Sequence, residues 1–133
     1  MAKKAAKNTK SKAAPRKPGG ADIRIKRAYD PPSPDDGLRI LIDRLWPRGV
    51  PKAKLKLDSW VKHLSPSTAL RKWYGHDPEK FTEFRRRYMA ELKQEGEGLA
   101  ELRAAVKGRT VTLLTSTKEL DLSHAIVLRD LLA

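Results

Sequence analysis

The sequence has no cysteine among its 133 residues. That absence excludes disulfides, thiolate metal sites and a cysteine nucleophile, and it suits a reducing compartment. Long apolar runs are also missing, because no stretch approaches the roughly 20 apolar residues that a membrane-spanning helix needs. The first residues lack the apolar core of a secretory signal. We therefore expect a cytoplasmic protein that binds no membrane.

Residues 1–20 contain no acidic residue and, after Met1, no large aliphatic one. Seven basic side chains give this segment a net charge of +7, more than half of the +13 of the whole chain. Such a composition cannot bury enough apolar surface to offset the entropy lost on ordering. We expect a disordered basic tail that either aids solubility or binds nucleic acid without sequence preference. Residues 21–133 then form the folded domain.

Three segments of the folded part have the patterns of strands. Residues 23–29 alternate apolar and basic side chains, which is typical of a half-buried strand. Residues 38–45 include three consecutive aliphatic side chains and predict a strand buried on both faces. A third short strand is predicted over 111–115. The segment 55–63 is ambiguous, with the pattern of a short strand followed by a helical turn.

Helix signals fill the rest of the domain. Ser65 and Asp77 each stand before a proline, and both predict helix starts, because a side-chain cap followed by proline suits the first turn. The expected helices cover about 66–75, 78–94, 99–108 and, after the cap Ser123, the end of the chain. Strands that alternate with helices indicate an α/β fold. We expect a small, largely parallel sheet flanked by helices in a single compact domain.

Polar side chains crowd the end of the predicted strand 38–45. This segment offers a carboxylate, two guanidiniums and an indole, which suit an acid–base group, an anion-binding fork and a stacking surface. The four side chains are Asp43, Arg44, Trp46 and Arg48. In open α/β sheets, ligands bind at the carboxyl ends of the strands. The alternative is structural: an Asp43–Arg44 pair that holds the loop, with Trp46 in the core.

A second polar cluster follows the predicted strand 111–115. Thr115, Ser116 and Lys118 come directly after the apolar residues, and Ser123 and His124 begin the next helix. Hydroxyl groups, a lysine and the free N–H groups of a helix start can hold a phosphate or a carboxylate. The glycines of a nucleotide-binding P-loop are missing. In the alternative reading, Ser123 only caps the helix and His124 only packs.

Parallel neighbouring strands would bring the two clusters into one pocket. We expect this pocket to bind a small anionic, phosphate-bearing ligand. The ligand contacts would come from Arg44, Trp46, Arg48, Thr115, Ser116, Lys118 and Ser123. Asp43 and His124 form the single acid–base pair that the sequence offers, so they would be the catalytic residues if the protein is an enzyme.

A rival hypothesis is a nucleic-acid-associated protein that binds through the basic tail and Arg85–Arg87. These arginines lie on a helix whose apolar stripe includes Phe84 and Tyr88, so at least two of them face solvent. A solvated helix face is the simpler explanation of the run. His63 and His76 are isolated and match no metal-ligand spacing, so we expect neither a metal nor a cofactor.

The sequence DRLWPRG at residues 43–49 is the most specific part of a longer pattern, which has looser segments at 26–30, 36–40, 66–72 and 113–125. Over about residues 22–133 the chain resembles the YeaO-like branch of the DUF488 family. The resemblance implies a compact α/β fold and no particular reaction, because the family is a domain of unknown function. Wider members carry a cysteine at the end of the last strand and Cys-His-Arg at the next helix start. Thr115 and Ser123 stand there in this chain, so thiol chemistry does not carry over.

Overall fold

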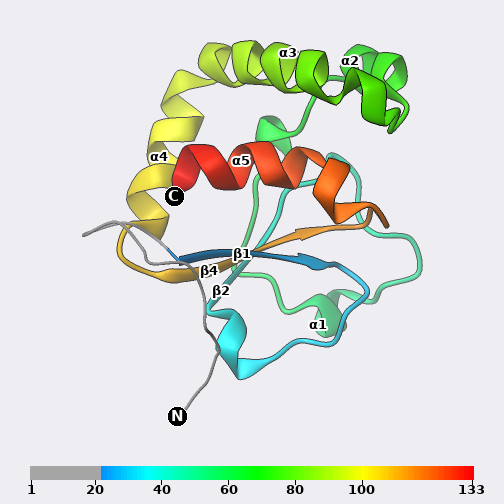
Figure 1. The fold of residues 1–133 in the computed structure, drawn as a ribbon. Coiled ribbons are helices and arrows are strands. Elements are labelled where there is room, and N and C mark those ends of the chain that lie inside the picture. Colours follow the sequence, from blue (N-terminus) through cyan, green and yellow to red (C-terminus); the bar gives the residue numbers. More distant parts are fainter. Residues whose placement is uncertain (1–21) are drawn as a thin grey trace.

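A parallel sheet lies at the centre of the molecule, whose structure, a computed structural model, describes residues 22–133 (Figure 1). Its strands are β1 (Asp22–Arg27), β2 (Leu38–Leu41), β3 (Ser59–Trp60) and β4 (Thr110–Thr115), and they are ordered β1-β4-β2-β3 with all neighbours parallel. The prediction of a largely parallel sheet in an α/β fold is confirmed. The predicted basic tail, residues 1–20, lies outside the described residues.

Two of the predicted strands end earlier than the sequence suggested. The strand expected over 38–45 stops at Leu41, although the Ile42 amide still donates to the Leu114 carbonyl oxygen at 3.1 Å. Asp43 lies beyond the end of β2, where its carboxylate accepts hydrogen bonds from Thr115 and Ser116 at the end of β4. The strand expected over 23–29 stops at Arg27, where the Asp30 side chain accepts from the Arg27 amide and closes a turn.

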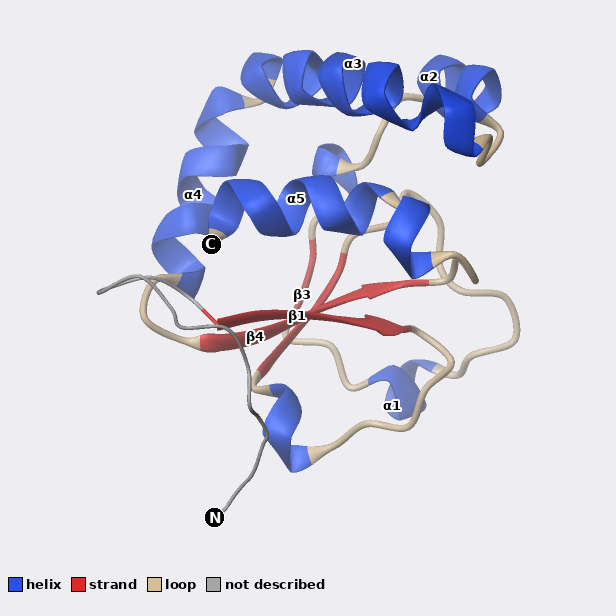
Figure 2. Ribbon diagram, in the orientation of Figure 1, coloured by secondary structure: helices blue, strands red, loops and turns tan. Residues whose placement is uncertain are grey.

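Helices cover both faces of the sheet unequally (Figure 2). On one face, α5 (His124–Leu132) contacts β1 and β4, and α3 (Phe81–Gln94) packs outside α5. The shorter α2 (Thr68–Tyr74) and α4 (Gly96–Val106) both contact α3, and the small α1 (Lys52–Leu55) lies on the opposite side of the sheet. Short 3-10 turns occupy Pro34–Asp36, Lys62–Leu64, Pro78–Lys80 and Leu120–Leu122. Within residues 22–133, no helix is long and apolar enough to cross a membrane.

The alternation of side chains along the strands divides the core into two clusters. Ile40 and Leu113 point into the large cluster under α3, α4 and α5. Their neighbours Leu41 and Leu114 point into a small cluster on the other face, which Leu55 of α1 completes. Because both faces of β2 and β4 are covered, every residue of these strands after the first is buried, and their carboxyl ends lie at the same edge of the sheet.

The helix α2 begins two residues later than the sequence predicted, at Thr68. Ser65, the predicted cap, ends the preceding 3-10 turn, and Ser67 caps α2 by accepting from the Leu70 amide at 3.1 Å. The Glu91 carboxylate of α3 in turn accepts from the backbone amide and the hydroxyl of Ser67, at 2.8 and 2.6 Å. This contact between residues 24 positions apart selects Ser67 over Ser65, and it fixes α2 against α3.

Candidate functional site

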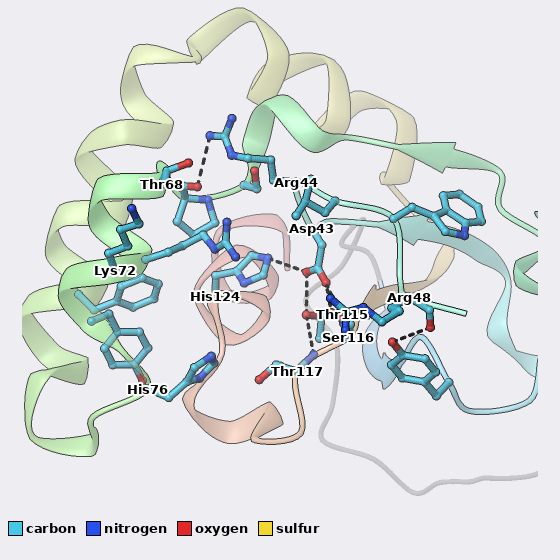
Figure 3. A pocket seen from close by; sticks show the side chains of 18 residues that line it. Asp43, Arg44, Arg48, Thr68, Lys72, His76, Thr115, Ser116, Thr117 and His124 are labelled. Atoms are coloured by element: carbon cyan, nitrogen blue, oxygen red, sulfur yellow. Dashed lines mark hydrogen bonds and ion pairs between the residues drawn. The ribbon is translucent and has the colours of Figure 1, made fainter. Parts of the chain in front are cut away.

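A pocket of about 540 Å³ opens at the carboxyl edge of the sheet (Figure 3). It is lined by the segment after β2, the segment after β4, the start of α5 and the side of α2. The parallel pairing of β2 with β4 explains the first two walls, because parallel neighbours end at the same edge. The two polar clusters of the sequence therefore meet in one cavity.

Most of the residues chosen from the sequence lie in this pocket. Those that line it are Asp43, Arg44, Trp46, Arg48, Thr115, Ser116 and His124. Lys118 is exposed on the loop that follows and is not among the lining residues. Ser123 is buried, at 1% exposure, where its hydroxyl caps α5 by accepting from the Ala125 amide. Neither Lys118 nor Ser123 presents its side chain to the cavity.

Asp43 is the anchor of the site. Its carboxylate accepts from the Thr115 hydroxyl at 2.7 Å and from the backbone amide and hydroxyl of Ser116 at 2.8 and 2.9 Å. Burial by itself would raise the pKa of Asp43, but the contacts with His124, Ser116 and Thr115 outweigh it and hold the pKa below the ordinary 3.8. The donors of Ser116, which the sequence suggested for an external anion, are thus engaged by an internal carboxylate.

His124 lies beside Asp43, at the first position of α5. Its Nε2 is 3.4 Å from the nearer Asp43 oxygen and 3.0 Å from the Ile42 carbonyl oxygen. Both neighbours can only accept, so Nε2 carries a hydrogen, and in the neutral ring Nδ1 is then the acceptor. The ring packs edge-on against buried Tyr88, with 5.9 Å between centroids. Burial, followed by the nearby Glu91 and Asp43 charges, raises the pKa of Tyr88, so its hydroxyl stays protonated and donates to the Leu64 carbonyl oxygen at 2.6 Å.

Four long cationic side chains surround this centre. Arg44 and Arg48 follow β2, whereas Arg71 and Lys72 project from α2. All four are exposed, and within the described part of the chain none of them forms an ion pair with a carboxylate. The Arg44 guanidinium makes one long hydrogen bond, 3.4 Å, to the Pro66 carbonyl oxygen. Asp43 is the single acid among the lining residues, so the pocket is strongly positive.

The wall formed by α2 was missed by the sequence analysis. It contributes Thr68, Arg71 and Lys72, and the turn after it contributes His76. Figure 3 shows Lys72 and His76 on the opposite side of His124 from Ser116 and Arg48. The basic pair at 71–72 belongs to the looser family pattern at 66–72, and this was the one signal that could have pointed to α2.

His76 has an unusual backbone. Its φ is +58°, and it follows Gly75, whose φ is +53°. The left-handed region costs most L-residues roughly 1–2 kcal/mol, and such strain gathers at functional sites when the fold imposes it. The His76 ring lies 5.6 Å from that of Tyr74, which is itself fixed by a hydrogen bond to the Leu122 carbonyl oxygen. The turn therefore holds an imidazole at the rim of the pocket.

The aromatic wall is formed by Trp46 and Tyr29. The Trp46 indole N–H donates to the Val50 carbonyl oxygen at 2.6 Å, and its ring meets Trp60 edge-on at 5.6 Å. Trp46 is thus partly a core residue, as the structural alternative held, and also lines the pocket. Among residues 22–133, no three His, Cys, Asp or Glu side chains gather as a metal ion would need.

Comparison with known proteins identifies the family to which the chain belongs. A family model described as "Inactive DUF488-N3 subclade" matches residues 22–133, which is the whole described part of the chain. The chain therefore belongs to the DUF488 family, and the resemblance noted from its sequence is confirmed.

Relatives in two bacterial groups share most of the chain. It is 46% identical over 112 residues to the uncharacterized protein YeaO of Escherichia coli, which covers 82% of this chain and 95% of YeaO. It is 44% identical over 110 residues to the uncharacterized protein Rv3073c of Mycobacterium tuberculosis, which covers 83% and 92% of the two chains. No solved structure matches the chain.

Proposed function

We propose that the pocket binds a small anionic, phosphate-bearing ligand. The observation that carries this proposal is the group of four cationic side chains without carboxylate partners, Arg44, Arg48, Arg71 and Lys72, around one cavity. Guanidinium groups and ammonium groups are the side chains that recognise phosphate oxygens best. The one acid of the pocket, Asp43, is already bonded to Thr115 and Ser116, so it does not neutralise this cluster by direct contact.

We assign binding without turnover to this site. The family description "inactive" supports this assignment, and so does the bonding of Asp43. A general base must have a free lone pair near the reacting proton. Both Asp43 oxygens accept hydrogen bonds from Thr115 or Ser116, and the Nε2 of His124 faces acceptors of the protein itself, so the free lone pair of the neutral His124 ring is on Nδ1. In this proposal Asp43 positions His124 and the end of β4, and the cationic side chains hold the ligand.

Isothermal titration of the full chain with inorganic phosphate tests the proposal. Arg71→Ala should weaken phosphate binding by about tenfold or more, since one charge-assisted hydrogen bond contributes roughly 1.5–3 kcal/mol. Arg86→Ala is the matched control, because it removes the same charge from an exposed guanidinium that is paired with Glu83. Equal weakening in both variants, or no saturable binding to the wild-type chain, would contradict the proposal.

The rival function, nucleic-acid binding through residues 1–20 and Arg85–Arg87, draws less support from the described residues. Arg85 pairs with Asp130 at 3.0 Å, and Arg86 and Arg87 both bond Glu83 at 2.6–2.9 Å. A phosphate backbone would have to compete with these carboxylates. Duplex DNA binding that loses its salt dependence when residues 1–20 are removed would support the tail as the binding arm. The expected cytoplasmic location also stays a prediction.

A further inference from the structure

We propose that the ligand of this pocket is a nucleoside phosphate, whose base lies on Tyr29 and Leu45 while its phosphate meets the cationic side chains. This inference rests on the proposed function and adds to it the class of the organic group. It follows from the size of the cavity, from the distribution of exposed apolar side chains and from the way Tyr29 is held.

The cavity is larger than an inorganic anion requires. Pockets of roughly 300–1,000 Å³ accommodate organic ligands of drug size, and this one measures about 540 Å³. Its walls also differ in chemistry. Arg71 and Lys72 stand on the α2 side, whereas the segments after β1 and β2 add the apolar side chains Tyr29, Leu45 and Trp46, which a phosphate alone would not use. A ligand that satisfies both walls has a charged end and an apolar end.

Exposed apolar side chains are concentrated at this pocket. In the described part of the chain, the large hydrophobic residues that are exposed are Tyr29, Leu45 and Met89, at 44%, 68% and 36%. Two of these three line the cavity. Scattered exposed apolar residues are ordinary, but a pair of them at the rim of a positively charged cavity indicates a surface for an apolar ligand group.

Tyr29 is fixed in a manner that suits stacking. Its hydroxyl donates to the Arg48 carbonyl oxygen at 3.1 Å, and the Arg27 guanidinium lies over its ring, 5.2 Å from the centroid. The Arg27 Nε in turn donates to the Thr117 carbonyl oxygen at 3.3 Å, so the loops after β1, β2 and β4 are tied together at the ring. A ring held at both its edge and one face loses little entropy when a planar group stacks on it.

The flat group of a nucleoside phosphate matches this arrangement. Bases stack on aromatic side chains whatever their sequence identity, because every base presents a π-face. The phosphate supplies the charge that Arg44, Arg71 and Lys72 recognise. The same chemistry can reach the pocket as a free mononucleotide or as the phosphorylated 5′ end of a strand, and the two sources are separated by experiment.

Isothermal titration of the full chain with AMP, ribose 5-phosphate and inorganic phosphate tests the inference. AMP should bind more tightly than ribose 5-phosphate, by about fivefold to a hundredfold, which is the contribution of stacking one base. Tyr29→Ala should lower the ratio of AMP affinity to ribose 5-phosphate affinity to about one, because the ring on which the base stacks is gone. Tyr29→Phe keeps the ring without the hydroxyl and should retain most of the advantage. A short 5′-phosphorylated oligonucleotide that binds more tightly than AMP at equal salt would assign the pocket to strand ends.

The possible failures are distinct. Equal affinities for AMP and ribose 5-phosphate, with saturable binding of both, would overturn the nucleoside and leave the anion pocket standing. Equal losses of AMP and ribose 5-phosphate binding in Tyr29→Ala would also overturn it, because the ring would then act only on the shape of the pocket. Absence of saturable binding by all three probes would overturn the proposed function itself.

Discussion

Two aspartates bracket the same strand, and they have opposite surroundings. Asp36 precedes β2 and is 4% exposed; its carboxylate contacts the charged groups of Arg39 and Lys26 and accepts from the Ser33 amide. Asp43 follows β2, and its carboxylate accepts from neutral hydroxyl and amide groups beside His124. The first site is closed by the chain's own cations, whereas the second opens into a pocket whose cations have no acid partner.

The comparison separates a structural carboxylate from one that builds a ligand site. Burial alone would raise the pKa of Asp36, yet Ser33, Lys26 and Arg39 bring it below the ordinary 3.8, and the pKa of Asp43 is lowered as well. A lowered pKa therefore does not distinguish the two. What distinguishes them is the state of the neighbouring cations: paired at Asp36, free around Asp43.

The largest expected effect is on stability, at Asp36. Asp36→Asn should lower the free energy of unfolding by about 3–5 kcal/mol, because it leaves the buried Arg39 guanidinium without its counter-charge. Asp35→Asn is the matched control, since Asp35 is exposed and its hydrogen bonds with Arg24 and Ser33 use its backbone oxygen and backbone amide. Urea denaturation measures both. If Asp36→Asn lowered the free energy of unfolding by less than about 1 kcal/mol, Asp36 would not be a structural carboxylate.

Asp43→Asn should cost less stability than Asp36→Asn, and it should strengthen phosphate binding in the pocket. The amide that replaces one carboxylate oxygen faces the donors of Ser116, so we expect a loss of about 1–3 kcal/mol. Removal of the negative charge should at the same time tighten phosphate binding, because the four cations then act without it. Urea denaturation and phosphate titration of one preparation test both parts. Weaker phosphate binding in a folded variant would show that Asp43 supports the ligand through His124.

The two aspartates also predict how stability depends on pH. Because their pKa values are lower in the folded chain than in the unfolded one, the unfolded chain takes up more protons as pH falls. Their contribution is complete above the unfolded value of about 4 and is lost as pH falls toward the folded pKa values. The urea midpoint of the wild-type chain should fall between pH 5 and pH 2. The urea midpoint of Asp36→Asn should fall less steeply over the same pH range. An unchanged slope would contradict a lowered pKa of Asp36 in the folded chain.

The smallest expected effect is at the strained rim of the pocket. His76→Gly should raise the free energy of unfolding by up to about 1 kcal/mol, because glycine adopts a φ of +58° without the steric cost. His76→Asn tolerates this conformation and should stay near the wild type. Thermal denaturation compares the three. A clear loss of stability in His76→Gly would mean that the ring contact with Tyr74 outweighs the backbone strain.

The sequence predicted which residues meet at the carboxyl edge of the sheet, but it did not predict that α2 forms the opposite wall of the pocket. Two buried apolar runs, each followed by polar residues, predicted that Asp43 and Ser116 meet, since parallel neighbours end together. The position of α2 depends on Glu91 bonding Ser67, and nothing local distinguishes Ser67 from Ser65 as the cap. The basic side chains that α2 brings to the pocket were missed for that reason.

Lys118 shows a different limit of the sequence pattern. Its position soon after β4 suggested a ligand contact, but the loop bends at Lys118, directly after Thr117, whose carbonyl oxygen accepts from Arg27, and Lys118 is left exposed beyond the lining residues. Adjacency in sequence places a residue near a sheet edge without fixing the direction of its side chain. The neighbouring residue Thr117 contacts Arg27, 90 residues away in the sequence, and the local pattern gives no sign of that contact.

The central claim is that the cations around Asp43 form a specific anion site, and a phosphate titration followed by NMR on the full ¹⁵N-labelled chain tests it most directly. The claim predicts saturable shifts with one common midpoint at the side-chain signals of Arg44 and Arg71 and at the His124 ring. Arg86, paired with Glu83, should remain nearly unshifted. Shifts that rise without saturation and appear equally at Arg86 would contradict the claim, because they would show only screening of a basic surface by salt.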